Sequence, residues 1–111
     1  MEGISKGIGG IGIDINSNKT IGGVEYRVHY IDGEWSLWSK NGELTGLSYD
    51  LRLIDGIQIR FYKAYKVNYD IFYKVGYCDG TWTKWCSNGE IAGYMGVKGN
   101  VDKIEVKMEK K

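Results

Sequence analysis

Two stretches of this 111-residue chain are nearly the same: DGEWSLWSKNGELTG at residues 32–46 and DGTWTKWCSNGEIAG at residues 79–93. Each contains an Asp-Gly pair, two tryptophans three positions apart and an Asn-Gly-Glu triplet, and the second stretch follows the first by 47 positions. Sliding the chain on itself by 47 aligns residues 24–61 with residues 71–108 without a gap, and 13 of the 38 pairs are identical. A fixed offset of this kind indicates two copies of one supersecondary unit.

Each copy has the pattern of a series of β-strands. Apolar and polar residues alternate through 24–30 and 71–77, and again through 57–61 and 104–108, which is typical of half-buried strands. The Asp-Gly and Asn-Gly pairs tolerate the positive φ angles of tight two-residue hairpin turns. The linkers between the strands are too short for a helix of typical length. The sequence therefore predicts an all-β fold.

A shorter segment near the N-terminus repeats part of this pattern. IGGIGIDI at residues 8–15 aligns with the last strand of each copy, IDGIQIRF at 54–61 and VDKIEVKM at 101–108. We therefore expect it to be an orphan closing strand, left from a further copy of the unit. A single strand must hydrogen-bond to another strand and bury its apolar side, so we expect it to pair with one of the complete repeats.

The expected organisation is a single domain whose strands share one core. Two arrangements fit. A sandwich of two repeats related by a pseudo-twofold axis is favoured, because only two full copies exist and repeat pairs bury their apolar faces against one another. The alternative is an incomplete β-prism of three sheets. In either case the units are residues 1–111 (the domain), 8–15 (the orphan strand), 24–61 (repeat 1) and 71–108 (repeat 2).

The charge balance argues against two classes of partner. The chain has 15 basic and 14 acidic residues, a net charge of +1, so it has no long-range field to attract nucleic acid or an anionic membrane surface. It also has no long apolar run and no recognisable signal peptide. We therefore expect no nucleic-acid or membrane partner, and export or release as part of a longer protein.

The tryptophan pairs are the first candidates for ligand binding. In a strand, residues three apart point to opposite faces, so we expect one of Trp35 and Trp38 to face the core and the other the solvent. The same holds for Trp82 and Trp85. An outward indole that recurs in both copies, beside polar turn residues, predicts a platform for the apolar C–H face of a sugar ring.

The polar residues of the repeated turns are the second candidates, as hydrogen-bonding partners for hydroxyl or amide groups. Turn chemistry explains the Asp and Asn residues without a ligand, but a turn does not require the glutamate that follows. The predicted ligand-binding residues are Trp35, Trp38, Asp32, Asn41, Glu43, Trp82, Trp85, Asp79, Asn88 and Glu90.

Catalytic and metal chemistry find no support in the sequence. The only histidine, His29, has Gly76 at the equivalent place in the second copy and is expected on the surface. Paired carboxylates would lie in shallow sites without the apolar surroundings that raise the pKa of a catalytic acid. The cysteines, Cys78 and Cys86, do not repeat and fit no zinc spacing. We expect no catalytic residues, no metal and no cofactor.

Taken with the closing strands, GEWSLWSKNGELTG and GTWTKWCSNGEIAG resemble the clostridial hydrophobic repeat with an invariant tryptophan (the ChW-like repeat) of clostridial surface proteins. The chain is also similar to the carboxy-terminal cell-wall-binding domains of clostridial phage endolysins. The likeness covers both copies, and depends on the tryptophan, the Asn-Gly pair, the glycine after it and the apolar closing strand.

The resemblance implies a non-catalytic module that binds peptidoglycan or wall polysaccharide and targets a lytic enzyme or a surface protein to the Gram-positive envelope. It implies action at the extracellular cell wall, and is compatible with fusion to an N-terminal catalytic domain or with a homo-oligomer. The alternative function is a structural or adhesion module that mediates protein–protein contacts or oligomerisation.

Overall fold

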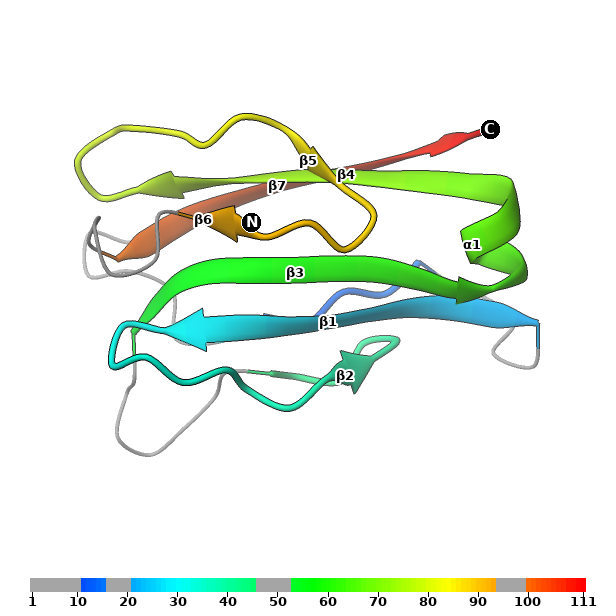
Figure 1. The fold of residues 1–111 in the computed structure, drawn as a ribbon, viewed down its shortest axis with the longest axis horizontal. Coiled ribbons are helices and arrows are strands. Elements are labelled where there is room, and N and C mark those ends of the chain that lie inside the picture. The colour runs from blue at the N-terminus through cyan, green and yellow to red at the C-terminus, as the bar shows by residue number, and fades with distance from the viewer. Residues whose placement is uncertain (1–10, 16–20, 46–52, 94–99) are drawn as a thin grey trace.

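The computed structural model describes residues 11–15, 21–45, 53–93 and 100–111. These residues form seven strands in two antiparallel sheets and one short helix, so the predicted all-β class is confirmed (Figure 1). In the described part of the chain no helix has the length and hydropathy needed to cross a bilayer. The strands are β1 (Gly22–Tyr30), β2 (Ser39–Lys40), β3 (Ile54–Lys63), β4 (Tyr69–Tyr77), β5 (Cys86–Ser87), β6 (Ala92–Gly93) and β7 (Val101–Lys110), and the helix is α1 (Ala64–Asn68).

The two long hairpin ladders have the same register. The sheets have the orders β2-β1-β3-β6 and β5-β4-β7. Val24 pairs with Phe61 in the β1–β3 ladder, and Ile71 pairs with Met108 in the β4–β7 ladder. Each partner lies 47 positions from its counterpart, so the hydrogen bonds recur at the offset seen in the sequence. The linker between the copies holds only the five-residue α1.

The two copies are joined by a strand that crosses from one to the other. β6 follows β5 in the second copy, yet it pairs with β3 of the first, with Gly56 opposite Gly93 and Ile57 opposite Ala92. Figure 1 shows β6 lying between β3 and β4. The first sheet therefore contains three strands of the first copy, β2, β1 and β3, and one strand of the second, β6.

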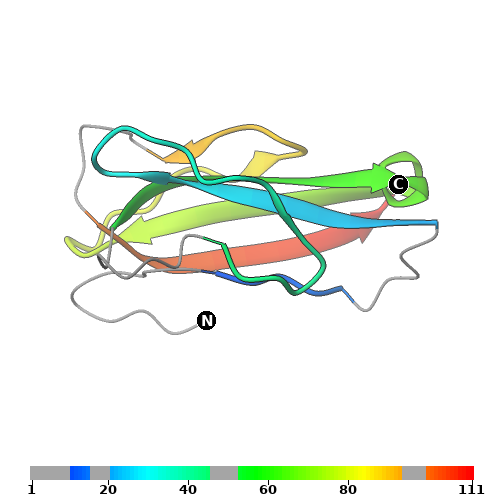
Figure 2. The same cartoon turned by 90° about the horizontal axis from the view of Figure 1, so that it is seen from below.

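The N-terminal segment repeats this contact for the first copy. Ile11 pairs with Thr45 in an antiparallel bridge, and the Gly42 amide donates to the Ile13 carbonyl at 2.7 Å, as the Gly89 amide donates to Ile59 at 2.8 Å (Figure 2). Residues 11–15 thus lie against the first copy as β3 lies against the second. Residues 8–10 of the predicted orphan strand lie outside the described residues.

The pseudo-twofold arrangement is wrong for the part of the molecule that the structure describes. A twofold rotation would exchange strands in both directions and would pair Thr45 with β7. Thr45 pairs with Ile11 instead. The copies are therefore related head to tail, because the N-terminal segment carries the same apolar alternation as β3 and occupies the place that β7 would need. The incomplete prism stays a prediction.

The core is built from the alternating residues of the four long strands. Tyrosines carry much of it, and each buried hydroxyl has a partner: Tyr26 and Tyr73 donate to the carbonyls of Glu43 and Glu90, and Tyr77 donates to the Asp55 carbonyl at 2.9 Å. Because Tyr77 and Asp55 belong to different copies, the last bond also links them. The fully buried side chains include Val24, Tyr26, Val28, Ile54, Ile57, Ile59, Ile71, Tyr73, Val75, Tyr77 and Val101.

The two kinds of turn differ. Asn41 and Gly42 have φ angles of 48° and 91°, as the predicted two-residue primed turn requires. In the Asp-Gly turn only Gly33 has a positive φ, 107°. Its amide donates to Tyr30 at 2.9 Å and the Tyr30 amide donates to Glu34 at 2.7 Å, so the loop has three residues and ends in a glycine bulge.

The crossing strand predicts a glycine requirement at position 93. Gly93 has a φ of 150°, and a Cβ atom there would lie 2.5 Å from the Asp55 carbonyl oxygen and 2.7 Å from the Gly56 Cα. We expect Gly93→Ala to lower the free energy of unfolding by about 3 kcal/mol or more, because backbone atoms must move. The control is Gly80→Ala, where φ is 91° and no atom lies within 4 Å. This control is expected to cost about 1–2 kcal/mol of conformational strain alone. Equal costs in urea unfolding would contradict the close contact.

Tyr73 predicts a loss of stability at high pH. Burial raises the pKa of Tyr73 to about 12, whereas an unfolded tyrosine has a pKa of about 10. Folding thus favours the neutral phenol. The contribution of Tyr73 to the free energy of unfolding is therefore complete below a pH of about 10 and is lost as the pH rises toward 12. A pKa difference of about two between the folded and unfolded states corresponds to about 2.7 kcal/mol of stability. The measurement is urea unfolding across this range, for the wild type and for Tyr73→Phe. A difference between the two proteins that stays constant with pH would contradict the prediction.

Candidate functional site

The tryptophans of each pair lie on the same side of their sheet, not on opposite faces as predicted. The three-residue loop and the single bridge of Trp35 to His29 interrupt the strand, so the alternation of faces does not continue to Trp38. None of the four indoles belongs to the buried core, and Trp85 is 40% exposed. The expected inward tryptophan of each pair is therefore wrong.

In the first copy, two arginines lie against the tryptophans. The Arg27 guanidinium carbon lies 4.3 Å from the Trp35 ring centroid and 4.8 Å from that of Trp38, and the Arg60 carbon lies 3.8 Å from Trp38. The Nε atom of Arg27 donates to Gln58 at 2.7 Å, which holds the guanidinium in place. Distances of this size give cation–π attraction. We call Trp35, Trp38, Arg27 and Arg60 the first indole cluster.

The second copy has lysines at the same places. The Lys74 ammonium lies 4.9 Å from the centroids of both Trp82 and Trp85, and the Lys107 ammonium lies 4.6 Å from Trp85. Lys74 also pairs with Glu105 at 3.5 Å. We call Trp82, Trp85, Lys74 and Lys107 the second indole cluster. Every member lies 47 positions after its counterpart in the first.

Sequence reasoning missed the cations of both clusters. The comparison of the copies counted identical residues, and Arg27 with Lys74, like Arg60 with Lys107, keeps only the positive charge. Counting residues of like charge at the same offset would have found them. A cation repeated beside a repeated tryptophan is the pattern that identifies the site.

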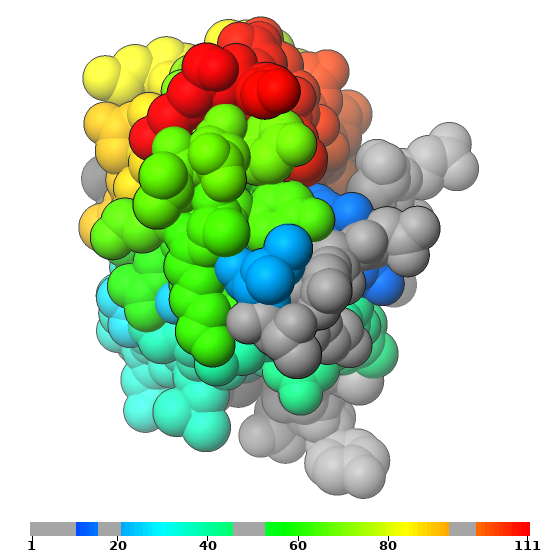
Figure 3. All heavy atoms as spheres, turned by 90° about the vertical axis from the view of Figure 1, so that its right-hand side faces the viewer, coloured from blue at the N-terminus to red at the C-terminus, as the bar shows by residue number. Residues whose placement is uncertain are grey.

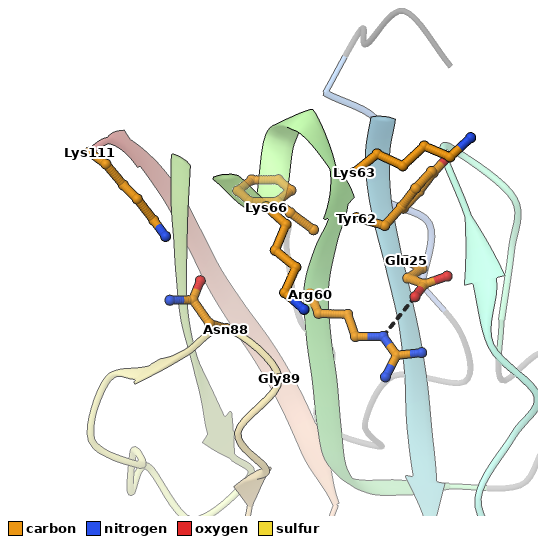
Figure 4. A pocket seen from close by; sticks show the side chains of 9 residues that line it. Glu25, Arg60, Tyr62, Lys63, Lys66, Asn88, Gly89 and Lys111 are labelled. Atoms are coloured by element: carbon orange, nitrogen blue, oxygen red, sulfur yellow. Dashed lines mark hydrogen bonds and ion pairs between the residues drawn. The ribbon is translucent and has the colours of Figure 1, made fainter. Parts of the chain in front are cut away.

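A cleft of about 630 Å³ adjoins the first cluster at the junction of the two copies. Its walls are the end of β3, Glu25 of β1, Lys66 of α1, the turn at residues 88–89 and the C-terminal Lys111. In Figure 4 the side chain of Lys66 reaches toward Arg60 and that of Lys111 toward Asn88. Arg60 contacts Trp38 and also lines the cleft, so the indole surface and the cleft are continuous.

The cleft carries more positive than negative charge. Four basic residues and one acidic residue line it: Arg60, Lys63, Lys66, Lys111 and Glu25. Arg60 Nε lies 2.7 Å from a Glu25 oxygen, and the Lys111 ammonium lies 3.8 Å from Asp70, just outside the lining. Lys63 and Lys66 form no salt bridge with any described residue. In Figure 4 Lys66 reaches toward Arg60 whereas Lys63 points away from it, so the charge of Lys66 remains for an anionic group of a ligand.

The polar turn residues predicted as ligand contacts hold their own turns. The side-chain oxygen of Asn41 accepts from the Val24 amide at 3.0 Å, and Asn88 accepts from Ile71 in the same way. The Glu43 carboxylate accepts from the Lys40 amide at 2.8 Å; Glu90 likewise accepts from Ser87 at 2.7 Å. Asp32 and Asp79 accept from the amide two residues on. These bonds explain the recurrence of all six residues without a ligand.

His29 is not the surface residue that was expected. It is 8% exposed, its Nδ1 atom lies 2.5 Å from an Asp55 carboxylate oxygen, and its ring meets the Trp35 ring edge to face at 4.9 Å. Gly76 stands at this place in the second copy, and the Trp82 ring lies 3.0 Å from where its Cβ would be. The buried pair is therefore a feature of the first copy that supports Trp35 from beneath.

The described residues contain no group of three or more His, Cys, Asp or Glu side chains that could hold a metal ion. The chain matches no family model, and comparisons with curated proteins and with solved structures give no match. The indole clusters and the cleft are shallow, charged and aromatic. This chemistry suits the binding of a polar ligand that carries an apolar face.

If the repeated glutamate holds its turn, its replacement should lower the stability of the protein. We expect Glu90→Ala to lower the free energy of unfolding by about 1 kcal/mol, because the Ser87 amide loses its charged acceptor. The control is Glu109→Ala, since Glu109 meets Lys107 at 3.7 Å on an exposed strand and such pairs contribute little. Equal effects in urea unfolding would mean that the Glu90 carboxylate does not hold the turn.

Proposed function

We propose that this chain is a non-catalytic module that binds the glycan of a Gram-positive cell wall and targets a lytic enzyme or surface protein to the envelope. The observation that carries the proposal is the presence of two indole clusters at the same offset, each with its tryptophans outside the core. The resemblance of the chain to ChW-like repeats supports the same function. The place of action is then the extracellular wall.

The chemistry of the clusters suits a sugar. The face of a pyranose ring that carries C–H groups is apolar and slightly electropositive, and it stacks on an indole. Trp85, the most accessible of the four rings, offers such a surface. Arg27 and Lys74 lie over the indole rings and carry several N–H donors, which suit ring hydroxyls and carboxylates. One cluster thus offers both interactions that a sugar unit needs.

The cleft adds a preference for negative charge. Arginine guanidinium groups bind carboxylates and phosphates through two parallel hydrogen bonds, and lysines bind them as point charges. Arg60 connects the indole surface to Lys66 and Lys111 in the cleft. A polymer with alternating sugar and anionic groups could occupy both parts at once. We therefore propose an acidic wall glycan as the ligand, and peptidoglycan with its carboxylates as the simplest member of that class.

The presence of two clusters compensates for weak single contacts. One aromatic platform with a few hydrogen bonds binds a sugar unit in about the millimolar range. Two clusters on one rigid domain act at high effective concentration on a polymer, and can raise the apparent affinity by about 100-fold. A module of this size can then remain attached to a wall although each contact is short-lived.

The alternative function, an adhesion module that joins protein partners through its tryptophans, is less favoured. An apolar protein surface docked on the clusters would remove the guanidinium and ammonium groups of Arg27 and Lys74 from water. Burial of charge without a partner is costly. A sugar leaves these groups hydrogen-bonded, so the clusters are better matched to a glycan.

The test replaces the exposed Trp85 of the second copy and its counterpart Trp38 of the first, and measures retention on purified Gram-positive walls. Trp38→Ala and Trp85→Ala are each expected to lose most of the retention, and the double variant nearly all of it, because avidity requires both clusters. Since neither ring belongs to the buried core, each change should cost much less stability than truncation of a core aromatic.

The matched control is Leu37→Ala, which removes an apolar side chain that is 89% exposed and neighbours Trp38. It is expected to bind like the wild type. Circular dichroism and urea unfolding show whether each variant is folded. Full retention by a folded double variant would overturn the proposed function.

A further inference from the structure

The last strand leaves one edge without a partner in the described part of the chain. β7 pairs with β4 on one side, and no described strand pairs with its other side. The equivalent strand β3 has β1 on one edge and β6 on the other. Figure 3 shows the C-terminal strand, in red, on the outside of the molecule. An unpaired edge is a template for pairing with another strand.

The apolar side of β7 is also incompletely covered. Val106 and Met108 are 41% and 39% exposed, whereas Ile59 and Phe61, their counterparts in β3, are 0% and 4% exposed. A groove of about 230 Å³ runs between this side of β7 and the N-terminal segment at Ile11. The surface that β3 buries in this domain is therefore partly open on β7.

The charges of β7 alternate in sign along the strand. Lys103, Glu105, Lys107 and Glu109 lie on one side, and Ile104, Val106 and Met108 lie on the other. When this strand is placed antiparallel to a second copy of itself, with Val106 opposite Val106, every facing pair is complementary. The facing pairs are Lys103 with Glu109, Ile104 with Met108, and Glu105 with Lys107.

The neighbouring symmetric registers lack this match. With Glu105 at the centre, Glu105 would face Glu105 and Lys103 would face Lys107. With Lys107 at the centre, Lys107 would face Lys107 and Glu105 would face Glu109. Like charges directly opposite one another destabilise a strand pair, and opposite charges stabilise it. The charge pattern therefore excludes these two registers. A register centred on Ile104 or on Met108 also places opposite charges face to face, but it pairs fewer residues of β7. The register centred on Val106 is therefore favoured.

We propose that β7 pairs with β7 of a second copy of this chain, antiparallel about a twofold axis at Val106. The two three-stranded sheets then form one six-stranded sheet of order β5-β4-β7-β7-β4-β5. The partly open apolar residues of the two strands meet across the axis. The dimer brings four indole clusters together and so increases the number of contacts with a polymer.

Charge on an edge strand also occurs as a defence against pairing, and the pattern distinguishes the two roles. Lysines alone on an edge repel a second copy. Here Lys103 and Lys107 are each followed two residues later by a glutamate, so self-pairing neutralises both charges. From Ile104 to Met108 the inward side carries only apolar residues, so no charge opposes burial at the centre of the pair. The strand thus fits a copy of itself, and its charges oppose the registers centred on Glu105 and on Lys107.

The experiment measures the dimer dissociation constant by analytical ultracentrifugation of the whole chain. The wild type is expected to dimerise. Glu105→Lys and Lys107→Glu, made separately, each place two like-charge pairs in the dimer and should raise the dissociation constant by about tenfold or more. The double variant Glu105→Lys/Lys107→Glu restores opposite charges across the axis. It should return the constant to within about threefold of the wild type.

A second pair of variants tests the apolar contact. Val106→Lys should abolish the dimer, and Val67→Lys is the control, because Val67 is 71% exposed and belongs to α1, not to β7. Urea unfolding establishes that each variant is folded. A wild-type monomer at the highest soluble concentration would overturn the proposal. So would a double variant no better than the single ones, or dimerisation unaffected by all of these changes.

Discussion

The pairing of β6 with β3 is the contact on which the rest of the molecule depends. It involves only Gly56, Ile57, Ala92 and Gly93, yet it converts two hairpin units into one domain. The backbones approach so closely that position 93 has no room for a side chain. Because a chain of this length has little core to spare, a strand shared between the copies covers apolar surface that each copy alone would expose. The fully buried Ile57 shows the result.

Local features could be predicted because their causes lie within a few residues. The period-2 alternation located β1 and β4, and Asn-Gly located the primed turns, where both residues have positive φ angles. The likeness of the N-terminal segment to the closing strands also predicted a pairing that Ile11 makes with Thr45. The alternation of apolar and polar residues does not show which copy a strand will pair with. That choice depends on which edge is free after the long ladders have formed, and the twofold arrangement failed at this point.

The sequence identified the four tryptophans of the candidate site, but it gave neither their geometry nor the cations beside them. One extra loop residue before Trp35 and the loss of regular pairing after it put both tryptophans on one side, where strict alternation would separate them. The burial of His29 depends on Asp55, which lies far along the chain, so no local pattern could reveal it. The cations above the rings follow from β1 and β3 lying side by side, which brings Arg27 and Arg60 to the same indole.

The inequality of the two copies follows from their head-to-tail relation. The closing strand of the first copy becomes an inner strand, and the residues on its polar side are Gly56, Gln58, Arg60 and Tyr62, which carry one formal charge. The closing strand of the second copy has one edge that no described strand pairs with, and the same four places carry alternating lysine and glutamate. An inner strand needs small or uncharged residues where other chain segments cross it, whereas an edge needs charges that decide which strand can add to it. Divergence is thus concentrated where the environments of the copies differ, while the tryptophans and their cations, whose environments agree, recur at the same offset.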